Sequence, residues 1–279
     1  MLDVVWKGQI EKPYTKKRTL MEHAIEVAKR YDSAITLRQL FYQLVAANVV
    51  ENSEGEYKAV GRAVTTARKM GLLPFKDIED RGREVESTVK FIDAEDAVAW
   101  VKARFDQDRW INQDERVAVI CEKAALSGVV EPICRRWQVP YVASKGYSSL
   151  SLGAEVASKL WGYTILYFGD HDPSGVHMPK NWKELLEGFE ANCPVLPVAL
   201  TLDQVNHYDL VPQQVKPKDQ RSAAYIKTYG HECWELDALP PDVLTSMVES
   251  SITAFVDIDR WNERDAEIEA EREKIVTSI

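Results

Sequence analysis

The segment LYFGDHDPSG, residues 166–175, places two carboxylates directly after an apolar run. Leu166, Tyr167 and Phe168 are residue types that favour a buried β-strand. The proline and the glycine that follow are typical of the point at which a strand ends. Asp170 and Asp172 are therefore predicted to stand at the carboxyl end of a strand in the interior of the fold.

The sequence around this segment alternates between short apolar runs and longer amphipathic stretches. We predict strands at 116–121, 139–144, 163–169 and 194–200, and helices at 124–137, 148–162 and 176–190. Strands that alternate with helices of this length are typical of βαβ units. The fold class is therefore predicted to be α/β, with a Rossmann-like parallel sheet that helices cover on both faces.

The N-terminal part has a helical pattern instead. We predict helices at 19–31, 37–47 and 56–71, with Thr36 as the N-cap of the second and Gly71 as the end of the third. Three short helices in this order resemble a helix-turn-helix or winged-helix module. The third helix carries basic residues that suit contact with DNA phosphates, namely Arg62, Arg68 and Lys69.

The chain therefore divides into three predicted parts. A winged-helix-like module occupies residues 1–90, a connecting helix 91–115, and the α/β domain with its C-terminal extension 116–279. The last part of the extension is predicted to be a charged, exposed helix.

Composition limits the class of protein. The net charge of the 279 residues is −9, which argues against a protein that simply coats nucleic acid. The charge is uneven, since residues 1–90 hold 16 Lys and Arg against 13 Asp and Glu. The four cysteines are widely spaced and form no CxxC pair, which predicts reduced thiols and neither a zinc site nor a disulfide framework. With no long apolar run, we expect a cytoplasmic protein without membrane contact.

A third carboxylate is predicted to join the two aspartates. Glu122 follows the first predicted strand of the sheet, and the carboxyl ends of parallel strands meet at one edge. Carboxylates held together repel one another, and a divalent cation removes that conflict. Oxygen ligands in a semi-open site suit Mg²⁺, so Glu122, Asp170 and Asp172 are predicted metal ligands. An isolated DxD can also serve only as a turn or a helix cap.

These motifs resemble a known family. VICEKAAL, residues 119–126, followed by FGDHDPSG, residues 168–175, is similar to the Toprim domain of topoisomerases, primases and some nucleases. The form D-x-D-P-x-G most resembles the A subunit of topoisomerase VI and its meiotic double-strand-break relatives. SKGYSS, residues 144–149, resembles that family's Lys-Gly turn, which implies Lys145 as a DNA contact.

The resemblance extends to the N-terminal module. The family carries a nucleophilic tyrosine in a T-x-R-x-φ-[FY]-Y pattern, and TLRQLFY, residues 36–42, assigns that role to Tyr42 with Arg38 beside it. Gln39 departs from the pattern, where an acidic residue is usual. On a helix Tyr42 lies at the edge of an apolar stripe, so a tyrosine that packs in the core and keeps its hydroxyl in water fits the same pattern.

The resemblance implies Mg²⁺-dependent DNA strand cleavage by tyrosine transesterification, with Tyr42, Arg38 and Glu122 catalytic. It also implies a homodimer and an ATPase partner subunit. A hydrolytic Toprim nuclease without tyrosine chemistry and a non-catalytic DNA-binding subunit of a larger complex are the alternatives. Near the end of the chain, Glu235 and Asp237 in WELDAL are interpreted as helix-capping residues in preference to further ligands.

Overall fold

The computed structural model describes the chain except residues 1–14, 32–33, 80–88, 145–148, 217–219 and 276–279. Its centre is a four-stranded parallel sheet with the strand order β4-β3-β5-β6. The strands are β3 (Val117–Cys121), β4 (Tyr141–Ala143), β5 (Thr164–Phe168) and β6 (Val195–Ala199). Each lies inside one of the four predicted apolar runs, so the α/β class and the parallel sheet are confirmed.

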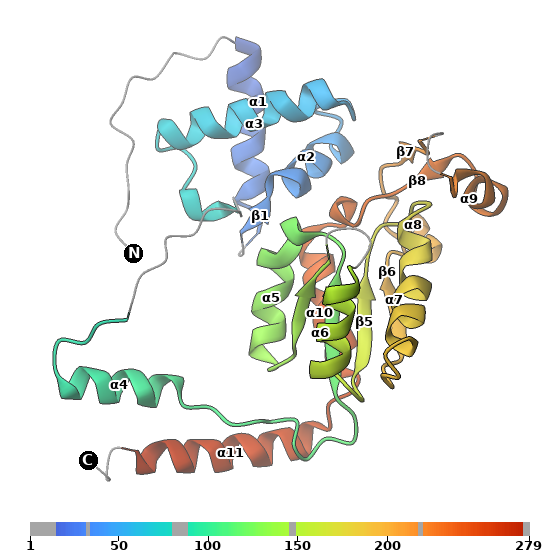
Figure 1. Cartoon of the computed structure of the whole chain (residues 1–279). Helices are drawn as coiled ribbons and strands as arrows, with labels where there is room; N and C mark the ends of the chain where they lie inside the picture. The colour runs from blue at the N-terminus through green and yellow to red at the C-terminus, as the bar shows by residue number, and fades with distance from the viewer. Residues whose placement is uncertain (1–14, 32–33, 80–88, 145–148, 217–219, 276–279) are drawn as a thin grey trace.

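Helices cover both faces of this sheet (Figure 1). The covering helices are α5 (Ser127–Arg136), α6 (Leu150–Lys159), α7 (Met178–Glu187) and α10 (Pro241–Thr253). Alternate residues of β3 and β5 enter two separate cores. Val119 and Phe168 pack with α5 and α10, whereas Ile120 and Tyr167 pack with α6 and α7. Because both faces of the two central strands are buried, β3 and β5 read as continuous apolar runs, whereas the edge strands β4 and β6 are more exposed.

The N-terminal module contains the three predicted helices, α1 (Thr15–Ala28), α2 (Leu37–Ala46) and α3 (Glu54–Lys69). Thr36 caps α2 as predicted, and Gln39 completes the capping box with its side chain, which gives this departure from the family pattern a structural role. Gly71, with a φ of +70°, follows the end of α3.

A winged helix also needs a β-hairpin wing, which the module does not show within residues 15–31 and 34–79. Its two short strands, β1 (Ile35–Thr36) and β2 (Ile78–Glu79), pair in parallel. The three-helix prediction is therefore confirmed, and the wing is not seen in the described part of the module. Buried side chains of α1, α2 and α3 belong to the same apolar core as one face of the sheet, so the module packs directly on the α/β domain.

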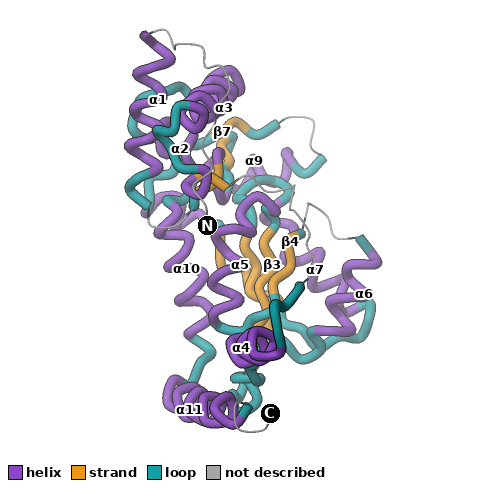
Figure 2. The backbone as a smooth tube through the Cα atoms, turned by 90° about the vertical axis from the view of Figure 1, so that its left-hand side faces the viewer, coloured by secondary structure: helices purple, strands orange, loops and turns teal. Residues whose placement is uncertain are grey.

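The module lies beyond one end of the sheet, together with the segment that follows β6 (Figure 2). This segment contains α8 (Leu202–His207), β7 (Gln213–Gln214), α9 (Ser222–Tyr229) and β8 (Glu232–Cys233). Strands β7 and β8 pair antiparallel. A short 3₁₀ helix, Leu236–Ala238, then leads back to α10 and contacts α2.

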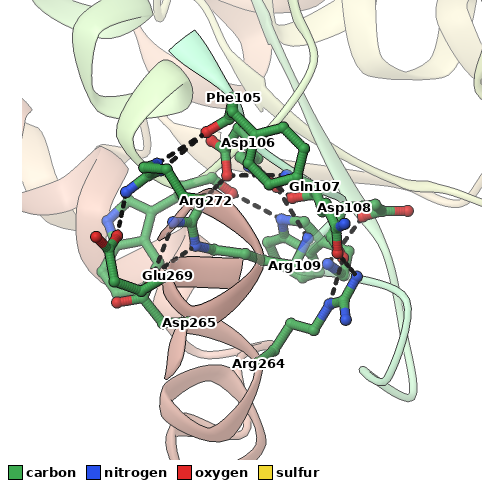
Figure 3. A network of polar contacts seen from close by, with 12 residues as sticks. Phe105, Asp106, Gln107, Asp108, Arg109, Arg264, Asp265, Glu269 and Arg272 are labelled. Carbon is green, nitrogen blue, oxygen red and sulfur yellow. Dashed lines mark hydrogen bonds and ion pairs between the residues drawn. The ribbon is translucent and has the colours of Figure 1, made fainter. Parts of the chain in front are cut away.

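Two further helices lie at the opposite end of the sheet, α4 (Ala94–Arg104) and α11 (Ile258–Lys274) (Figures 1 and 2). Helix α4 corresponds to the connecting helix predicted at 91–115 and is shorter than that range. The charged C-terminal helix is mostly exposed, as predicted, but Trp261 and Ile268 are buried. Arginines tie α11 to the segment that follows α4 (Figure 3). Arg109 binds Asp265 at 2.6 Å, and the Arg272 guanidinium donates to the Phe105 carbonyl at 2.9 Å.

The four cysteines are free thiols, as predicted. Among the residues that the structure describes, no helix has the length and apolar character needed to cross a bilayer.

Candidate active site at the carboxyl edge of the sheet

Glu122 and Asp170 lie together where β3 and β5 end. The two strands are neighbours, and Cys121 is paired with Phe168. The backbone N–H of Asp170 donates to Glu122 Oε2 at 3.3 Å, and the Tyr167 hydroxyl donates to the same oxygen at 3.2 Å. The register of the sheet therefore brings together two of the three carboxylates that the sequence predicts to meet.

The glycines of this segment are required by close packing. A Cβ on Gly175 would lie 2.0 Å from the carbonyl oxygen of Asp170, so the chain could not turn back so closely with any larger residue. A Cβ on Gly169 would lie 2.7 Å from Glu122 Oε2. These two positions allow the loop after β5 to fold tightly around the carboxylates.

Asp172 serves the same loop as a turn residue. Its Oδ1 accepts hydrogen bonds from the backbone N–H groups of Ser174 at 2.8 Å and Gly175 at 2.6 Å. The turn-forming alternative for the DxD motif is therefore correct for Asp172. The side chain is nevertheless half-buried beside a cavity of about 280 Å³. Burial raises the pKa of Glu122, and the negative charge of Asp172 raises it further, so the two carboxylates act on each other.

Lys123 is the cation at the centre of the site. Its ammonium lies 2.9 Å from Asp170 Oδ2, 3.2 Å from Glu235 Oε2 and 3.6 Å from Asp237 Oδ2. Burial lowers the pKa of Lys123, but the three carboxylates outweigh burial, so the net shift is upward and the side chain stays charged. Asp170 accepts a second hydrogen bond from the Leu236 N–H at 2.8 Å, yet burial still raises its pKa to about 7.

The network continues into the N-terminal module. Arg38 of α2 forms an ion pair with Glu235 Oε2, the oxygen that also binds Lys123. The side-chain amide of Gln213 donates to Glu235 Oε1 at 3.1 Å and to the hydroxyl of Tyr42. Tyr42 and Arg38 are thus connected to Asp170 through three side chains that come from distant parts of the sequence.

The capping role predicted for Glu235 and Asp237 is wrong. The helix at Leu236–Ala238 has no side-chain cap, because Glu235 is held by Arg38 and Lys123. The two cations lower the pKa of Glu235 against the effect of burial. The carboxylate of Asp237 is completely buried and receives no hydrogen bond from any residue that the structure describes. Burial raises the pKa of Asp237, and the positive charge of Lys123 opposes this effect only in part.

Tyr42 lies deeper than the edge position on α2 suggests, with only 3% of its surface exposed. The residue forms part of the wall of a cavity of about 500 Å³ between the module and β7. Burial raises the pKa of its hydroxyl, and the charge of Glu235 adds to this effect. In this conformation Tyr42 is protonated, and its hydroxyl accepts a hydrogen bond from the amide of Gln213. The hydroxyl is therefore neither in open water nor a free phenolate.

The donors at this edge suit Mg²⁺ chemically. No group of three or more His, Cys, Asp and Glu side chains is arranged to enclose one ion in the described parts of the chain. Mg²⁺ does not need such a group, because it often binds through one or two carboxylates and keeps several waters. Glu122 and Asp172, whose charges act on each other, could supply these two carboxylates. Asp170 is already neutralised by Lys123.

The four predicted DNA contacts have different surroundings. Arg62 is exposed on α3, whereas Lys69 is half-buried. The guanidinium of Arg68 donates to the carbonyls of Phe75, at 2.9 Å, and Ile78, which gives this residue a structural role that the sequence pattern did not suggest. The fourth, Lys145, lies outside the described residues.

We expect Arg68→Ala to lower the stability of the fold and Arg62→Ala to weaken DNA binding without a loss of stability. Arg68→Ala removes a charged donor from two carbonyls, so the free energy of unfolding should fall by about 1–3 kcal/mol. Arg62→Ala should leave stability unchanged and reduce the salt slope of DNA binding by about one. Urea titration and binding at several salt concentrations check both. An Arg62→Ala protein with an unchanged salt slope would exclude this face of α3 as a DNA contact.

Two members of the site, Lys123 and Gln213, were not predicted from the sequence, and a third, Glu235, was predicted with the wrong role. Lys123 had a signal, since a lysine directly after a carboxylate at a strand end must lie near that edge. Gln213 had none, because only the packing of β7 against α2 brings its amide to Tyr42. His171, between the two aspartates, packs its ring among Tyr225, Tyr229 and Trp234.

The chain matches no protein-family model, and no curated protein matches it significantly. Its function must therefore be inferred from its own residues and their contacts.

Proposed function

We propose that the protein cleaves DNA strands in a Mg²⁺-dependent reaction of the topoisomerase VI A type, in which Tyr42 is the nucleophile. The main support is the position of Tyr42. The cavity it lines and the cavity beside Asp172 share four wall residues, Gln213, Gln214, Lys216 and Glu235. These four residues lie between the two cavities, so a DNA strand that runs past them would meet Tyr42 in one cavity and the carboxylate of Asp172 in the other.

The chain's own residues have distinct roles in this proposal. The hydroxyl oxygen of Tyr42 forms a bond to phosphorus while a backbone P–O bond breaks, and the leaving deoxyribose oxygen takes up a proton. Gln213 orients that hydroxyl, and Arg38 adds positive charge near it. Mg²⁺, when bound by Glu122 and Asp172, supplies charge neutralisation at the phosphate. Lys123 keeps Asp170 and Glu235 in place.

A hydrolytic nuclease with the same carboxylates is the second candidate. One observation favours it, because Tyr42 is buried and its raised pKa opposes the phenolate that attack requires. In that case water attacks the phosphorus and Tyr42 only joins the module to the α/β domain. The homodimer and the ATPase partner are proposals that rest on the resemblance alone.

We expect Glu122→Gln to abolish cleavage and to keep the fold. The amide oxygen can still accept from Tyr167 and from the backbone of Asp170, so the local hydrogen bonds persist. The raised pKa of Glu122 means that folding disfavours its ionised form, so the neutral glutamine should hold or increase stability near neutral pH. End-labelled DNA with Mg²⁺ measures cleavage, and thermal melting in EDTA measures stability.

Glu155→Gln is the matched control, because Glu155 is an exposed glutamate on α6 that pairs only with Lys159 among the described residues. It should cut DNA at the wild-type rate. Undiminished cleavage by Glu122→Gln would remove the carboxylate edge from the reaction and with it the proposed function.

A further inference from the structure

The cavity beside Tyr42 lies between the N-terminal module and β7. Its volume of about 500 Å³ is within the usual range for a small-molecule site. Helix α2, the start of α3 and the segment around β7 each contribute to its wall. Four residues belong to the walls of both this cavity and the cavity beside Asp172, so the two cavities are neighbours, and we call the two together the Tyr42 groove.

An aromatic ring is held firmly in the wall of this groove. Tyr57 of α3 is half-buried and packs edge to face against Phe41, with 5.4 Å between the ring centroids. The guanidinium carbon of Arg38 lies 5.6 Å from the centre of the Tyr57 ring. Two neighbours therefore fix the orientation of the ring. The guanidinium lies over one face of the ring, so a base would use the other face, and aromatic rings of this kind are surfaces on which unpaired nucleobases stack.

The polar lining of the groove matches a nucleotide better than a duplex surface. Arg38 and Lys216 supply positive charge, and the amides of Asn52, Gln213 and Gln214 supply both donors and acceptors, as base edges require. Three acidic residues, Glu54, Asp172 and Glu235, line the groove with the two cations, so its wall carries no excess of positive charge. A wall without excess positive charge does not suit the dense phosphates of a duplex.

We propose that the Tyr42 groove binds one unpaired nucleotide of a DNA single strand. Its base stacks on Tyr57, and its phosphate lies toward Arg38 and Lys216. The proposal rests on the proposed function in one respect, since it makes the substrate of cleavage a DNA with a single-stranded segment beside the scissile phosphate. Helix α3 would then contribute a base contact through Tyr57 at its beginning, in addition to the phosphate contact tested at Arg62.

The test measures binding without cleavage. Fluorescence anisotropy in EDTA follows a labelled oligothymidine of eight nucleotides and a blunt duplex of the same length, with the full chain. We expect the single strand to bind more tightly. Tyr57→Leu should weaken single-strand binding between about 5-fold and 100-fold, the range expected for loss of one stacked base. Tyr57→Phe, which keeps the ring, should bind as the wild type does.

Exposed residues provide controls and a variant that does not disturb packing. Lys216→Glu places a negative charge at the surface of the groove and should weaken single-strand binding without changing the melting temperature. Lys180→Glu changes an exposed lysine of α7 that does not line the groove, and Trp161→Ala removes an exposed aromatic ring elsewhere. Both should bind DNA normally. If Tyr57→Leu has a lowered melting temperature, the comparison of single-strand binding by Lys216→Glu and by Lys180→Glu tests the groove assignment.

The outcomes also separate this inference from the proposed function. Unchanged single-strand binding by folded Tyr57→Leu and by Lys216→Glu would overturn the groove assignment, as would a blunt duplex that binds as tightly as the single strand. If cleavage by the wild type still requires Glu122 in that case, the proposed function stands. If the wild type cuts no DNA but its single-strand binding requires Tyr57, the groove assignment stands and the proposed function fails.

Discussion

Tyr42→Phe is expected to abolish the covalent protein–DNA adduct while the protein stays folded. The substitution removes one oxygen and keeps the ring that packs on Phe41. Gln213 loses a hydrogen-bond partner but retains Glu235, so the loss of stability should be limited to about 1 kcal/mol. The variant lacks the hydroxyl oxygen that would form the phosphotyrosine bond at this site, so cleavage should fall to background.

The measurement uses end-labelled DNA with Mg²⁺, resolved on a denaturing gel with and without protease. Wild-type adducts should migrate as free ends only after protease treatment. Tyr163→Phe is the matched control. Tyr163 lies just before β5, and its hydroxyl accepts a hydrogen bond from Arg116, so this variant also loses a hydrogen-bonded hydroxyl. It should form adducts normally. A Tyr42→Phe protein that releases free ends at a near-normal rate would establish the hydrolytic candidate and leave Tyr42 structural.

Lys123→Met is expected to cause the largest loss of stability. It removes the ammonium that compensates Asp170, Glu235 and Asp237 and keeps a side chain of similar length. Breaking a buried ion pair from one side costs about 3–5 kcal/mol, because the remaining charge is left without compensation. The largest part of the lost stability should arise at Asp237, since its carboxylate receives no hydrogen bond from the described residues and Lys123 is the main cation that acts on it.

Chemical denaturation of the variant and the wild type measures this loss. Lys159→Met is the control, because Lys159 pairs with Glu155 on the exposed face of α6, where a salt bridge contributes little to stability. Adding Asp237→Asn to Lys123→Met should restore part of the lost stability, since the uncompensated buried charge is then removed. If Lys123→Met is as stable as Lys159→Met, the ion pairs around Lys123 do not contribute to the stability of the fold.

Local patterns in the sequence were sufficient for the framework of the site. The apolar runs that end at Cys121 and Phe168 predicted strands that are buried on both faces, and the structure confirms them. Parallel strands bring their carboxyl ends to one edge whatever surrounds them. The meeting of Glu122 and Asp170 therefore followed from position in the sequence, as did the cap at Thr36.

The charges around that framework were decided by tertiary structure alone. Arg38 pairs with Glu235 across 197 positions of sequence, and the amide of Gln213 reaches Tyr42 across 171. A helical pattern shows which side of α2 is apolar, but the partner of a half-buried arginine depends on which distant segment packs against it. The sequence therefore determined that Glu122 and Asp170 meet, and only the packing of α2 against β7 and Leu236–Ala238 decided that Tyr42, Lys123 and Glu235 belong to one network.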